Sequence, residues 1–391
     1  MFLIDHPYIS EFLIETIKNN RFPIVSTKSA RELISKENLN WVSEKEAIQQ
    51  FKENPNQLIY SNSENVISWV ENNLNFTKLP SQISVFKDKI KFRQLLKDVY
   101  PNYFFKGVKF EDLNNIDIEN LPFPFIIKPS VGFFSLGVHK VDNKSEWPET
   151  LEKIKSEIHH IKGFYPAEVL NTNSFIIEEC IEGEEFAVDC YYNENSEAVI
   201  LNIMHHIFSS GKDVSDRIYC TSKEIIETNL PLIQQLVDTI GAKSNLTNFP
   251  IHIEVRIDKN GVIIPIEVNP MRFGGWCTTG DISYYAYGIN SYEYFLKQKK
   301  PNWSKILETK EDKTYSLVLL DNNSGIVAEN IQSFNYNQLL ADFEKPLLLR
   351  KIDVHQFPIF GFLFTETSKG NEQELAAILS SNLRNYIEFK K

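Results

Sequence analysis

The stretch IHIEVRIDKNGVIIPIEVNPMRFGG, residues 251–275, decides the fold of this chain. Two runs of alternating apolar and polar residues surround Asn260-Gly261, the favoured pair for a two-residue type I′ hairpin turn. That turn places Glu254 directly opposite Glu267. One face of the hairpin is then polar, and the other is an apolar face formed by Ile251, Ile253, Val255, Ile257, Ile264, Ile266 and Val268.

The polar face of this hairpin carries the ligands that a hard divalent ion prefers. Two carboxylates whose Cβ atoms lie about 4.5–5.5 Å apart repel each other unless a cation lies between them. His252 faces Asn269 in the same register, and oxygen atoms of Glu254, Glu267 and the Asn269 amide suit Mg²⁺, which keeps its waters and takes further ligands from substrate phosphates. The alternative is a solvated face on which Arg256 neutralises the two carboxylates, and these residues alone leave both interpretations open.

Composition limits the class of protein. The chain has 391 residues, of which 42% are hydrophobic, and a net charge of −11. This length predicts about two to four units of roughly 100–200 residues each, and the acidic balance disfavours nucleic-acid binding through a broad basic face. Four separated cysteines predict reduced thiols in a cytoplasm. Without a basic leader or an apolar run of roughly 18–20 residues, we expect neither secretion nor membrane insertion.

A second constellation, FPFIIKPSVGFFSLGVHKV at residues 123–141, predicts a strand, a loop and a returning strand. The first strand carries Lys128, and the loop contains Gly132, Ser135 and Gly137. Glycine lets a backbone approach phosphate oxygens, a serine hydroxyl can donate to them, and the lysine supplies a point charge. The stretch does not fit the P-loop pattern. An ordinary hairpin loop with a surface lysine is the alternative.

A third constellation is SFIIEECIEGEEFAVD at residues 174–189. An apolar strand breaks at Gly183, and Glu185 follows in a second strand. Such a break exposes backbone donors and acceptors beside apolar walls, which suits the edge of an adenine ring, and a nearby carboxylate could bind ribose hydroxyls. The alternative is an acidic surface turn.

In this order and spacing, the three stretches resemble the ATP-grasp superfamily, which includes D-alanine–D-alanine ligase, biotin carboxylase and amino-acid ligases. The resemblance covers about residues 85–290. It implies ATP and Mg²⁺ as cofactors, with Mn²⁺ as the alternative ion. The residues it implies are Lys89, Lys128 and Ser135 for the phosphates, Glu178 with the backbone of Glu179 and Ile181 for the adenine, Glu185 for the ribose, and Glu254, Glu267 and Asn269 for the metal.

One arginine departs from the superfamily pattern. Many relatives have an arginine two residues after the asparagine, whereas here Met271 intervenes and Arg272 is three residues after Asn269. The resemblance still implies a catalytic role for Arg272 at the γ-phosphate or the acyl phosphate, since two glycines follow it. We expect Arg256, on the face of the metal ligands, to contact phosphate or substrate as the second catalytic arginine.

The substrate pocket is expected near HHIFSSGKDVSDRIYCTS, residues 205–222. Arg217 or Lys212 could hold a carboxylate there, and Asp213 or Asp216 could hold an amine. His252 is a further candidate contact because it shares the polar face of the hairpin. We expect no catalytic role for the neighbouring histidines 205 and 206, because adjacent residues point to opposite sides of a strand.

The implied activity is ligation of a carboxylate to an amine through an acyl phosphate, with release of ADP and phosphate, as in amino-acid or peptide ligases. The alternatives are an ATP-grasp carboxylase of nucleotide biosynthesis and a nucleotide-binding regulatory protein without turnover. The expected partners are a small carboxylic acid and an amine, with neither nucleic acid nor membrane, and a homodimer is left open.

The fold class expected is α/β and α+β in several domains. Residues 1–85 form an N-terminal α/β (pre-ATP-grasp) domain, 86–175 the subdomain with the phosphate loop, 176–300 the subdomain with the adenine hinge and the metal hairpin, and 301–391 a small C-terminal α+β unit. Within them, the pattern predicts a helix over residues 88–100 that Pro101 stops and a helix over 229–242 that Gly241 closes.

Overall fold

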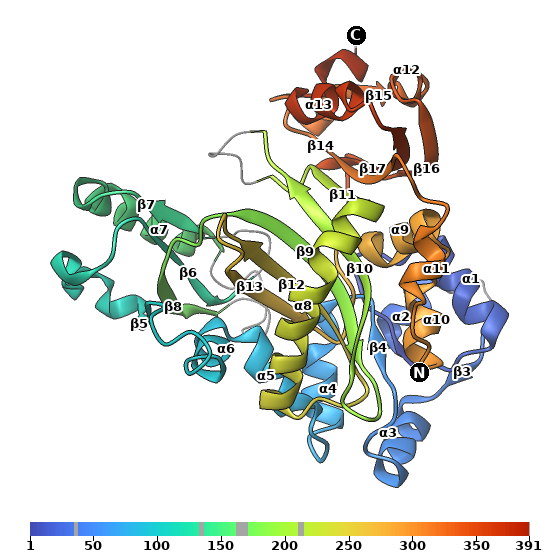
Figure 1. The fold of residues 1–391 in the computed structure, drawn as a ribbon, viewed down its shortest axis with the longest axis horizontal. Coiled ribbons are helices and arrows are strands. Elements are labelled where there is room, and N and C mark those ends of the chain that lie inside the picture. The colour runs from blue at the N-terminus through green and yellow to red at the C-terminus, as the bar shows by residue number, and fades with distance from the viewer. Residues whose placement is uncertain (35–37, 133–136, 162–170, 210–214, 391) are drawn as a thin grey trace.

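The computed structural model describes residues 1–34, 38–132, 137–161, 171–209 and 215–390. Figure 1 shows a long sheet through the middle of the molecule, a smaller sheet with its helices on one side, and the two terminal regions on the other. No helix among the described residues is long and apolar enough to cross a lipid bilayer. The mixed α/β and α+β organisation expected from the sequence is confirmed.

The N-terminal region is a parallel sheet with the strand order β3-β2-β1-β4. Its helices begin at side-chain caps, because Ser10, Thr27 and Ser43 each accept a hydrogen bond from a backbone N–H of the first turn. The elements are β1 (Phe2–Leu3), α1 (Glu11–Asn20), β2 (Ile24–Val25), α2 (Lys28–Leu33), β3 (Trp41–Val42), α3 (Glu44–Glu53), β4 (Tyr60–Ser61), η1 (Glu64–Val66) and α4 (Ile67–Asn73).

The next region is an antiparallel sheet of order β5-β8-β6-β7, preceded by two short helices. The expected domain boundary between residues 175 and 176 falls inside β8, so it would divide a single strand of this sheet. The elements are α5 (Leu79–Lys87), α6 (Lys89–Leu95), β5 (Phe105–Lys109), η2 (Phe110–Asn115), η3 (Ile118–Asn120), β6 (Phe125–Val131), β7 (His139–Val141), η4 (Lys144–Glu146), α7 (Trp147–Ile161) and β8 (Asn171–Glu179).

The long sheet has eight antiparallel strands in the order β13-β12-β9-β10-β11-β14-β17-β16. Apolar side chains of α8 pack on it in the largest core cluster, and the helix lies along the sheet in Figure 1. The elements up to the tail are β9 (Glu184–Tyr192), β10 (Ala198–Ile207), β11 (Ile218–Ser222), α8 (Lys223–Ser244), β12 (Phe249–Ile257), β13 (Ile263–Pro270), α9 (Thr278–Tyr287), α10 (Ser291–Leu296) and α11 (Trp303–Leu307).

The C-terminal region extends the long sheet, because β14 pairs with β11 and also with β17. It has its own core cluster, which includes Val318, Phe334, Phe360 and Leu383. Its elements are β14 (Lys313–Asp321), η5 (Ala328–Asn330), β15 (Ile331–Phe334), α12 (Tyr336–Ala341), β16 (Lys345–Lys351), β17 (Ile359–Ser368), α13 (Gln373–Ser380), η6 (Arg384–Tyr386) and β18 (Ile387–Phe389). The remaining domain boundaries stay predictions.

Two predicted helix ends are wrong. Helix α8 continues through Gly241 to Ser244 and is capped by Asn245 in the left-handed conformation. Gly241 is needed for packing, because a Cβ there would lie 2.4 Å from Cε1 of Tyr192. Helix α6 ends at Leu95, well before Pro101.

A buried ion pair ties the C-terminal region to α9. Asp281 is fully buried in α9, and the guanidinium of Arg350 in β16 is paired with its carboxylate. The Tyr292 hydroxyl donates to the same carboxylate at 2.5 Å. The Arg350 guanidinium also donates to the Trp276 carbonyl at 3.3 Å. The pair therefore joins β16 to the segment that follows the hairpin.

Replacing Arg350 by alanine should destabilise the protein by about 3–5 kcal/mol, because it leaves the Asp281 carboxylate buried without its cation. Urea denaturation followed by tryptophan fluorescence should show a lower midpoint. Lys300→Ala, which removes an exposed pair with Glu197, should leave the midpoint nearly unchanged. Equal midpoints for the Arg350→Ala protein and the unaltered protein would contradict a stabilising role of the buried pair.

Candidate active site

Strands β12 and β13 form the expected hairpin. Glu254 pairs with Glu267, and His252 pairs with Asn269, so the predicted register of the polar face is confirmed. About a quarter of each glutamate side chain is exposed, 24% for Glu254 and 25% for Glu267. The two carboxylates are therefore neighbours that remain open on one side to a ligand.

The predicted two-residue type I′ turn is wrong. The loop contains three residues, 259–261, and the Asp258 N–H donates to the Val262 carbonyl at 3.0 Å. A type I′ turn needs a positive φ at both central residues, but Asn260 lacks one and Gly261 has a φ of +77°. The Asp258 carboxylate accepts hydrogen bonds from the N–H groups of Asn260 and Val262, both at 2.8 Å, and these bonds stabilise the longer loop.

A β-bulge restores the register between this loop and the acidic pair. Near the loop, Val255 pairs with Pro265 and Arg256 pairs with Ile264, one position away from the predicted pairing. The pairing returns to the predicted register at the acidic pair because Ile266 is an extra residue in β13. The prediction that Ile264 lies on the apolar face is therefore wrong, since it pairs with Arg256.

The two facing glutamates have opposite electrostatic environments. Burial, and next the charge of Glu267, raise the pKa of Glu254. Burial also opposes ionisation of Glu267, but the charges of Lys89 and Lys128 outweigh it and lower its pKa to about 2. The Lys89 ammonium lies 2.9 Å from the Glu267 carboxylate. The Lys89 ammonium thus neutralises Glu267, whereas no lysine or arginine of the described residues is paired with Glu254.

The donor set at this place fits a hard cation. The Glu254 carboxylate lies 3.7 Å from Nε2 of His252. Burial opposes the charge of that imidazole, but Asp189 and Glu254 raise its pKa to about 9. The buried Asn269 amide has no hydrogen bond to any described residue. No three His, Cys, Asp or Glu side chains of the described residues form a complete metal site. A metal held by Glu254, Glu267 and Asn269 would therefore need water and ligand phosphates to complete its shell.

Lys128 on β6 lies in a buried charge cluster. Its ammonium is 2.7 Å from Oε1 of Glu178, and Nε of Arg93 donates to Oε2 of the same carboxylate at 2.6 Å. Burial opposes ionisation of Glu178, but Arg93 and Lys128 lower its pKa to about 2. The Glu178 side chain is thus a counter-ion for two cations, and the adenine role expected for it stays a prediction.

The hinge expected to bind adenine connects β8 to β9. The strand break predicted at Gly183 is confirmed, and Gly183 has a φ of +117° and packs against the Ile257 carbonyl. The Glu179 N–H donates to the Phe104 carbonyl at 3.1 Å, so it is already used. The Ile181 N–H has no hydrogen bond to the residues that the structure describes, which leaves a hinge donor for a ligand.

Arg256 lies at the corner between this hinge and the expected ribose position. Its Nε donates to Glu185 at 3.0 Å, and its NH1 group donates to the Ile181 carbonyl at 2.7 Å. Arg256 is therefore paired with Glu185 and does not neutralise the acidic pair, which was the alternative expected from the sequence. His206, for which we expected no catalytic role, lies with Nδ1 2.9 Å from Glu185 and orients that carboxylate.

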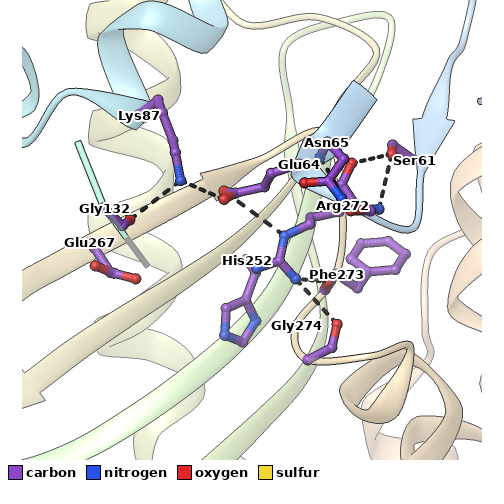
Figure 2. A network of polar contacts seen from close by, with 12 residues as sticks. Ser61, Glu64, Asn65, Lys87, Gly132, His252, Glu267, Arg272, Phe273 and Gly274 are labelled. Atoms are coloured by element: carbon purple, nitrogen blue, oxygen red, sulfur yellow. Dashed lines mark hydrogen bonds and ion pairs between the residues drawn. The ribbon is translucent and has the colours of Figure 1, made fainter. Parts of the chain in front are cut away.

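Arg272 belongs to a polar network that reaches the N-terminal region, drawn in Figure 2. The Lys87 ammonium of α5 is paired with the Glu64 carboxylate and donates to the Gly132 carbonyl at 3.4 Å. Nε of Arg272 lies 4.0 Å from Oε1 of Glu64, and neither atom has a hydrogen bond within the described chain. The NH1 group of Arg272 donates to the Phe273 carbonyl at 3.1 Å. The network links the arginine, through Glu64 and Lys87, to Gly132 at the start of the expected phosphate loop.

His252 is fixed by an aspartate that the sequence did not single out. Its Nδ1 lies 2.7 Å from Oδ1 of Asp189, and the Gly274 N–H donates to the same oxygen at 3.1 Å. A Cβ on Gly274 would lie 2.4 Å from Cε1 of His252. Glycine is therefore required where the segment after Arg272 crosses the imidazole.

Two residues expected to bind substrate, Arg217 and Asp216, have partners within the protein. Arg217 is buried, its NH2 group lies 2.5 Å from Oδ1 of Asp321, and it donates to the Ile378 carbonyl at 3.1 Å, so it holds the C-terminal region. Asp216 accepts a hydrogen bond from the Tyr219 hydroxyl at 2.7 Å. The proposed phosphate ligand Ser135, with Lys212 and Asp213, lies outside the described residues.

Four polar residues of the site were missed from the sequence: Glu64, Lys87, Arg93 and Asp189. Two of them had a usable signal, because FKDKIKFR places Arg93 four residues after Lys89 and therefore on the same helical face. Lys87 precedes Lys89 by two residues in the same stretch. Glu64 and Asp189 reach the site through contacts between distant segments, which no local pattern encodes.

Comparison with known proteins agrees with this geometry. A family model described as the ATP-grasp domain matches residues 121–280. D-alanine–D-alanine ligase A of Bacillus cereus is 28% identical over 171 residues, which cover 42% of this chain and 49% of that protein. The match therefore spans about half the length of this curated relative.

Two solved structures share the fold along the whole chain. The L-amino acid ligase from Bacillus licheniformis matches with a TM-score of 0.67 at 18% identity, over 100% of this chain and 98% of that one. The biotin carboxylase from Campylobacter jejuni in complex with β,γ-ATP matches with a TM-score of 0.66 at 12% identity, over 100% and 91%. Residues 121–280 therefore carry an ATP-grasp domain, and the chain as a whole shares the fold of these two solved structures.

Proposed function

We propose that this protein is an ATP-dependent ligase that joins a carboxylic acid to an amine, as amino-acid or peptide ligases do. The observation that carries the proposal is the facing pair Glu254 and Glu267, bordered by the cations Lys89 and Lys128. Two facing carboxylates are unfavourable by themselves. Together with nearby cations they suit a metal-bound triphosphate, in which negative and positive charges alternate.

The reaction proceeds in two displacements. A carboxylate oxygen of the acid attacks the γ-phosphorus of ATP, ADP leaves, and an acyl phosphate forms. The amine nitrogen then attacks the acyl carbon, inorganic phosphate leaves, and the amine loses a proton. This route needs no nucleophilic side chain, so positioning and charge stabilisation account for most of the rate.

Each cation has a role in this scheme. Lys128 and Lys89 bind phosphate oxygens and offset their charge. Arg272 binds the phosphoryl group during its transfer, since Glu64 and Lys87 link it to Gly132 at the start of the expected phosphate loop and closely packed glycine backbone follows it. The hinge N–H of Ile181 and the carboxylate of Glu185 hold the nucleoside, and Arg256 keeps that carboxylate in place.

The chain's oxygen donors fit Mg²⁺, or Mn²⁺ as the alternative ion, through Glu254, Glu267 and Asn269. Bound there, the ion would neutralise the negative charge that develops on the phosphoryl group during transfer. Glu267 also holds Lys89 in place through their 2.9 Å contact. The same side chain therefore serves the metal and a phosphate-binding lysine.

The partners that follow from this proposal are small molecules, an acid and an amine. We assign the protein to the cytoplasm, because its four cysteines are free thiols and a reducing compartment keeps them so. A homodimer stays a prediction from the sequence.

A carboxylase is the second candidate, because the fold match to biotin carboxylase is as good as the match to the amino-acid ligase. Such an enzyme would activate bicarbonate as the acid. A nucleotide-binding regulatory protein without turnover is the third, and it is disfavoured because simple binding does not require two facing carboxylates.

The purified protein should form ADP from ATP only when Mg²⁺, a suitable acid and an amine are present. A coupled assay for ADP with pooled amino acids measures this, and removal of Mg²⁺ with EDTA should abolish the signal. ADP formation that depends on bicarbonate would instead support the carboxylase. Absence of turnover with a broad panel of acids, amines and bicarbonate would support the regulatory protein and contradict the ligase.

Glu267→Gln should lower ATP-dependent turnover at least about 100-fold, because loss of a partner one shell away from a metal already lowers affinity or activity about 10–100-fold. The substitution removes the charge at nearly constant volume. Glu366→Gln, in the C-terminal sheet beside Lys313 and Lys345, is the matched control and should retain full activity. Near-normal turnover of Glu267→Gln would show that the metal assignment is wrong.

Arg272→Lys should lower kcat about 100-fold with little change in the KM for ATP, because a lysine keeps the charge but loses the planar donors that serve the phosphoryl group. Steady-state kinetics with saturating acid and amine separate the two parameters. Arg384→Lys, in the C-terminal η6, serves as the control. A raised KM at unchanged kcat would mean that Arg272 binds the ground state only.

A further inference from the structure

Arg93 contacts several elements of the site at once, which a residue that only binds phosphate does not need to do. It lies in α6, it is buried, and its Nε donates to Glu178 at 2.6 Å. Its NH1 group donates to the Pro265 carbonyl, and its NH2 group donates to the Ile266 carbonyl at 3.4 Å. The guanidinium carbon lies 4.8 Å from the centre of the Tyr103 ring. One side chain thus joins α6, β8 and β13.

The two carbonyls that Arg93 binds belong to the β-bulge of β13. A bulge leaves its extra residue outside the regular ladder of hydrogen bonds, and Pro265 has no N–H to donate to that ladder. Pro265 is buried and Ile266 is partly buried, so their freed carbonyls gain from a donor supplied by the protein. The guanidinium of Arg93 supplies them from a helix outside the sheet.

This bulge decides where the Glu267 side chain points. Side chains alternate between the two faces of a strand, so a slip of one residue moves every one of them to the other face. If Ile266 paired in the ladder instead of forming a bulge, the offset set by the three-residue loop would continue along β13. Glu267 would then lose its place opposite Glu254, and an isoleucine would approach that place.

Helix α6 acts on this part of β13 at two points. Lys89 and Arg93 are four residues apart, so they lie on the same face of the helix. Lys89 contacts the carboxylate of Glu267, and Arg93 contacts the backbone directly before it. Arg93 also shares Glu178 with Lys128, so the bulge and a phosphate lysine depend on one guanidinium.

We propose that Arg93 is a positioning residue: it holds the bulge of β13 so that Glu267 faces Glu254, and it couples this acidic pair to Lys128 through Glu178. The functional consequence of this proposal is metal-dependent nucleotide binding, and that consequence rests on the proposed function. The structural part of the proposal, the stability of the bulge, holds for the metal-free protein as well.

Lysine cannot replace arginine in this role. The guanidinium is planar and has five N–H donors, which let it serve a carboxylate and two carbonyls on different sides. A lysine ammonium keeps the charge opposite Glu178 but concentrates its donors on one atom. Arg93→Lys therefore separates the charge of Arg93 from its contacts to the bulge.

The consequence of the proposal is metal-dependent nucleotide binding. Calorimetry tests it by titrating Mg²⁺ into the protein in the presence of an unhydrolysable ATP analogue. Arg93→Lys should raise the Mg²⁺ concentration for half-maximal nucleotide binding about 10-fold or more. The matched control is Arg350→Gln, another buried arginine that pairs with a buried carboxylate and a backbone carbonyl. It should lower the thermal midpoint without changing the Mg²⁺ requirement, a difference that a merely structural role of Arg93 would not produce.

Hydrogen exchange of the metal-free protein tests the bulge directly. Amides of residues 263–270 should exchange faster in Arg93→Lys than in the unaltered protein, and Arg350→Gln should leave them unchanged. Unchanged exchange there, or an unchanged Mg²⁺ requirement in a folded Arg93→Lys protein, would overturn the proposal. If the unaltered protein itself binds no nucleotide with Mg²⁺, the proposed function fails, and the exchange result still decides whether Arg93 holds the bulge.

Discussion

The repulsion between Glu254 and Glu267 is the constraint on which the rest of the site depends. Two carboxylates on neighbouring strands at the same level are unfavourable unless positive charge lies near them. The protein supplies part of that charge with Lys89 and Lys128, which keep Glu267 ionised although it is largely buried. On the Glu254 side the described chain supplies the His252 imidazole, and no lysine or arginine is paired there. We propose that a cation that arrives with the ligand completes the balance of charge at the acidic pair.

The cations of the site are in turn held by carboxylates. Lys128 is paired with Glu178, and Lys87 with Glu64, all of them buried. A buried charge without a partner is strongly unfavourable, so these pairs allow positive charge to be stored in the interior before nucleotide binds. With Glu267, the partner of Lys89, these carboxylates come from three regions of the chain, and the N-terminal region takes part through Glu64. The site is thus a product of the whole fold rather than of the hairpin alone.

The sequence predicts the parts of this site that local patterns encode. Alternation around Asn260-Gly261 indicates the hairpin and the facing glutamates, and the strand break at Gly183 indicates the hinge. The turn type is missed because the Asp258 side chain stabilises a three-residue loop. The bulge is missed because Ile266 fits the alternation equally well in either register.

The remaining differences arise from long-range contacts. The sequence pattern predicts that Gly241 ends a helix, but Gly241 lies inside α8 and packs against Tyr192. The sequence predicts that Arg217 binds substrate, but Arg217 pairs with Asp321, which lies far along the chain in the C-terminal region. Arg93 contacts Pro265 across 172 positions of sequence. Such contacts depend on how elements pack, and a single sequence contains no local signal for them.

The most direct test of the central claim is whether the acidic pair takes up a divalent ion together with nucleotide. Electron paramagnetic resonance measures free Mn²⁺ in solution, and an unhydrolysable ATP analogue prevents turnover. Against a titration of analogue and ion without protein, the unaltered protein should remove additional Mn²⁺ from the free pool, and a protein carrying both Glu254→Gln and Glu267→Gln should not. Equal removal by the two proteins, or no additional removal by the unaltered one, would contradict the account.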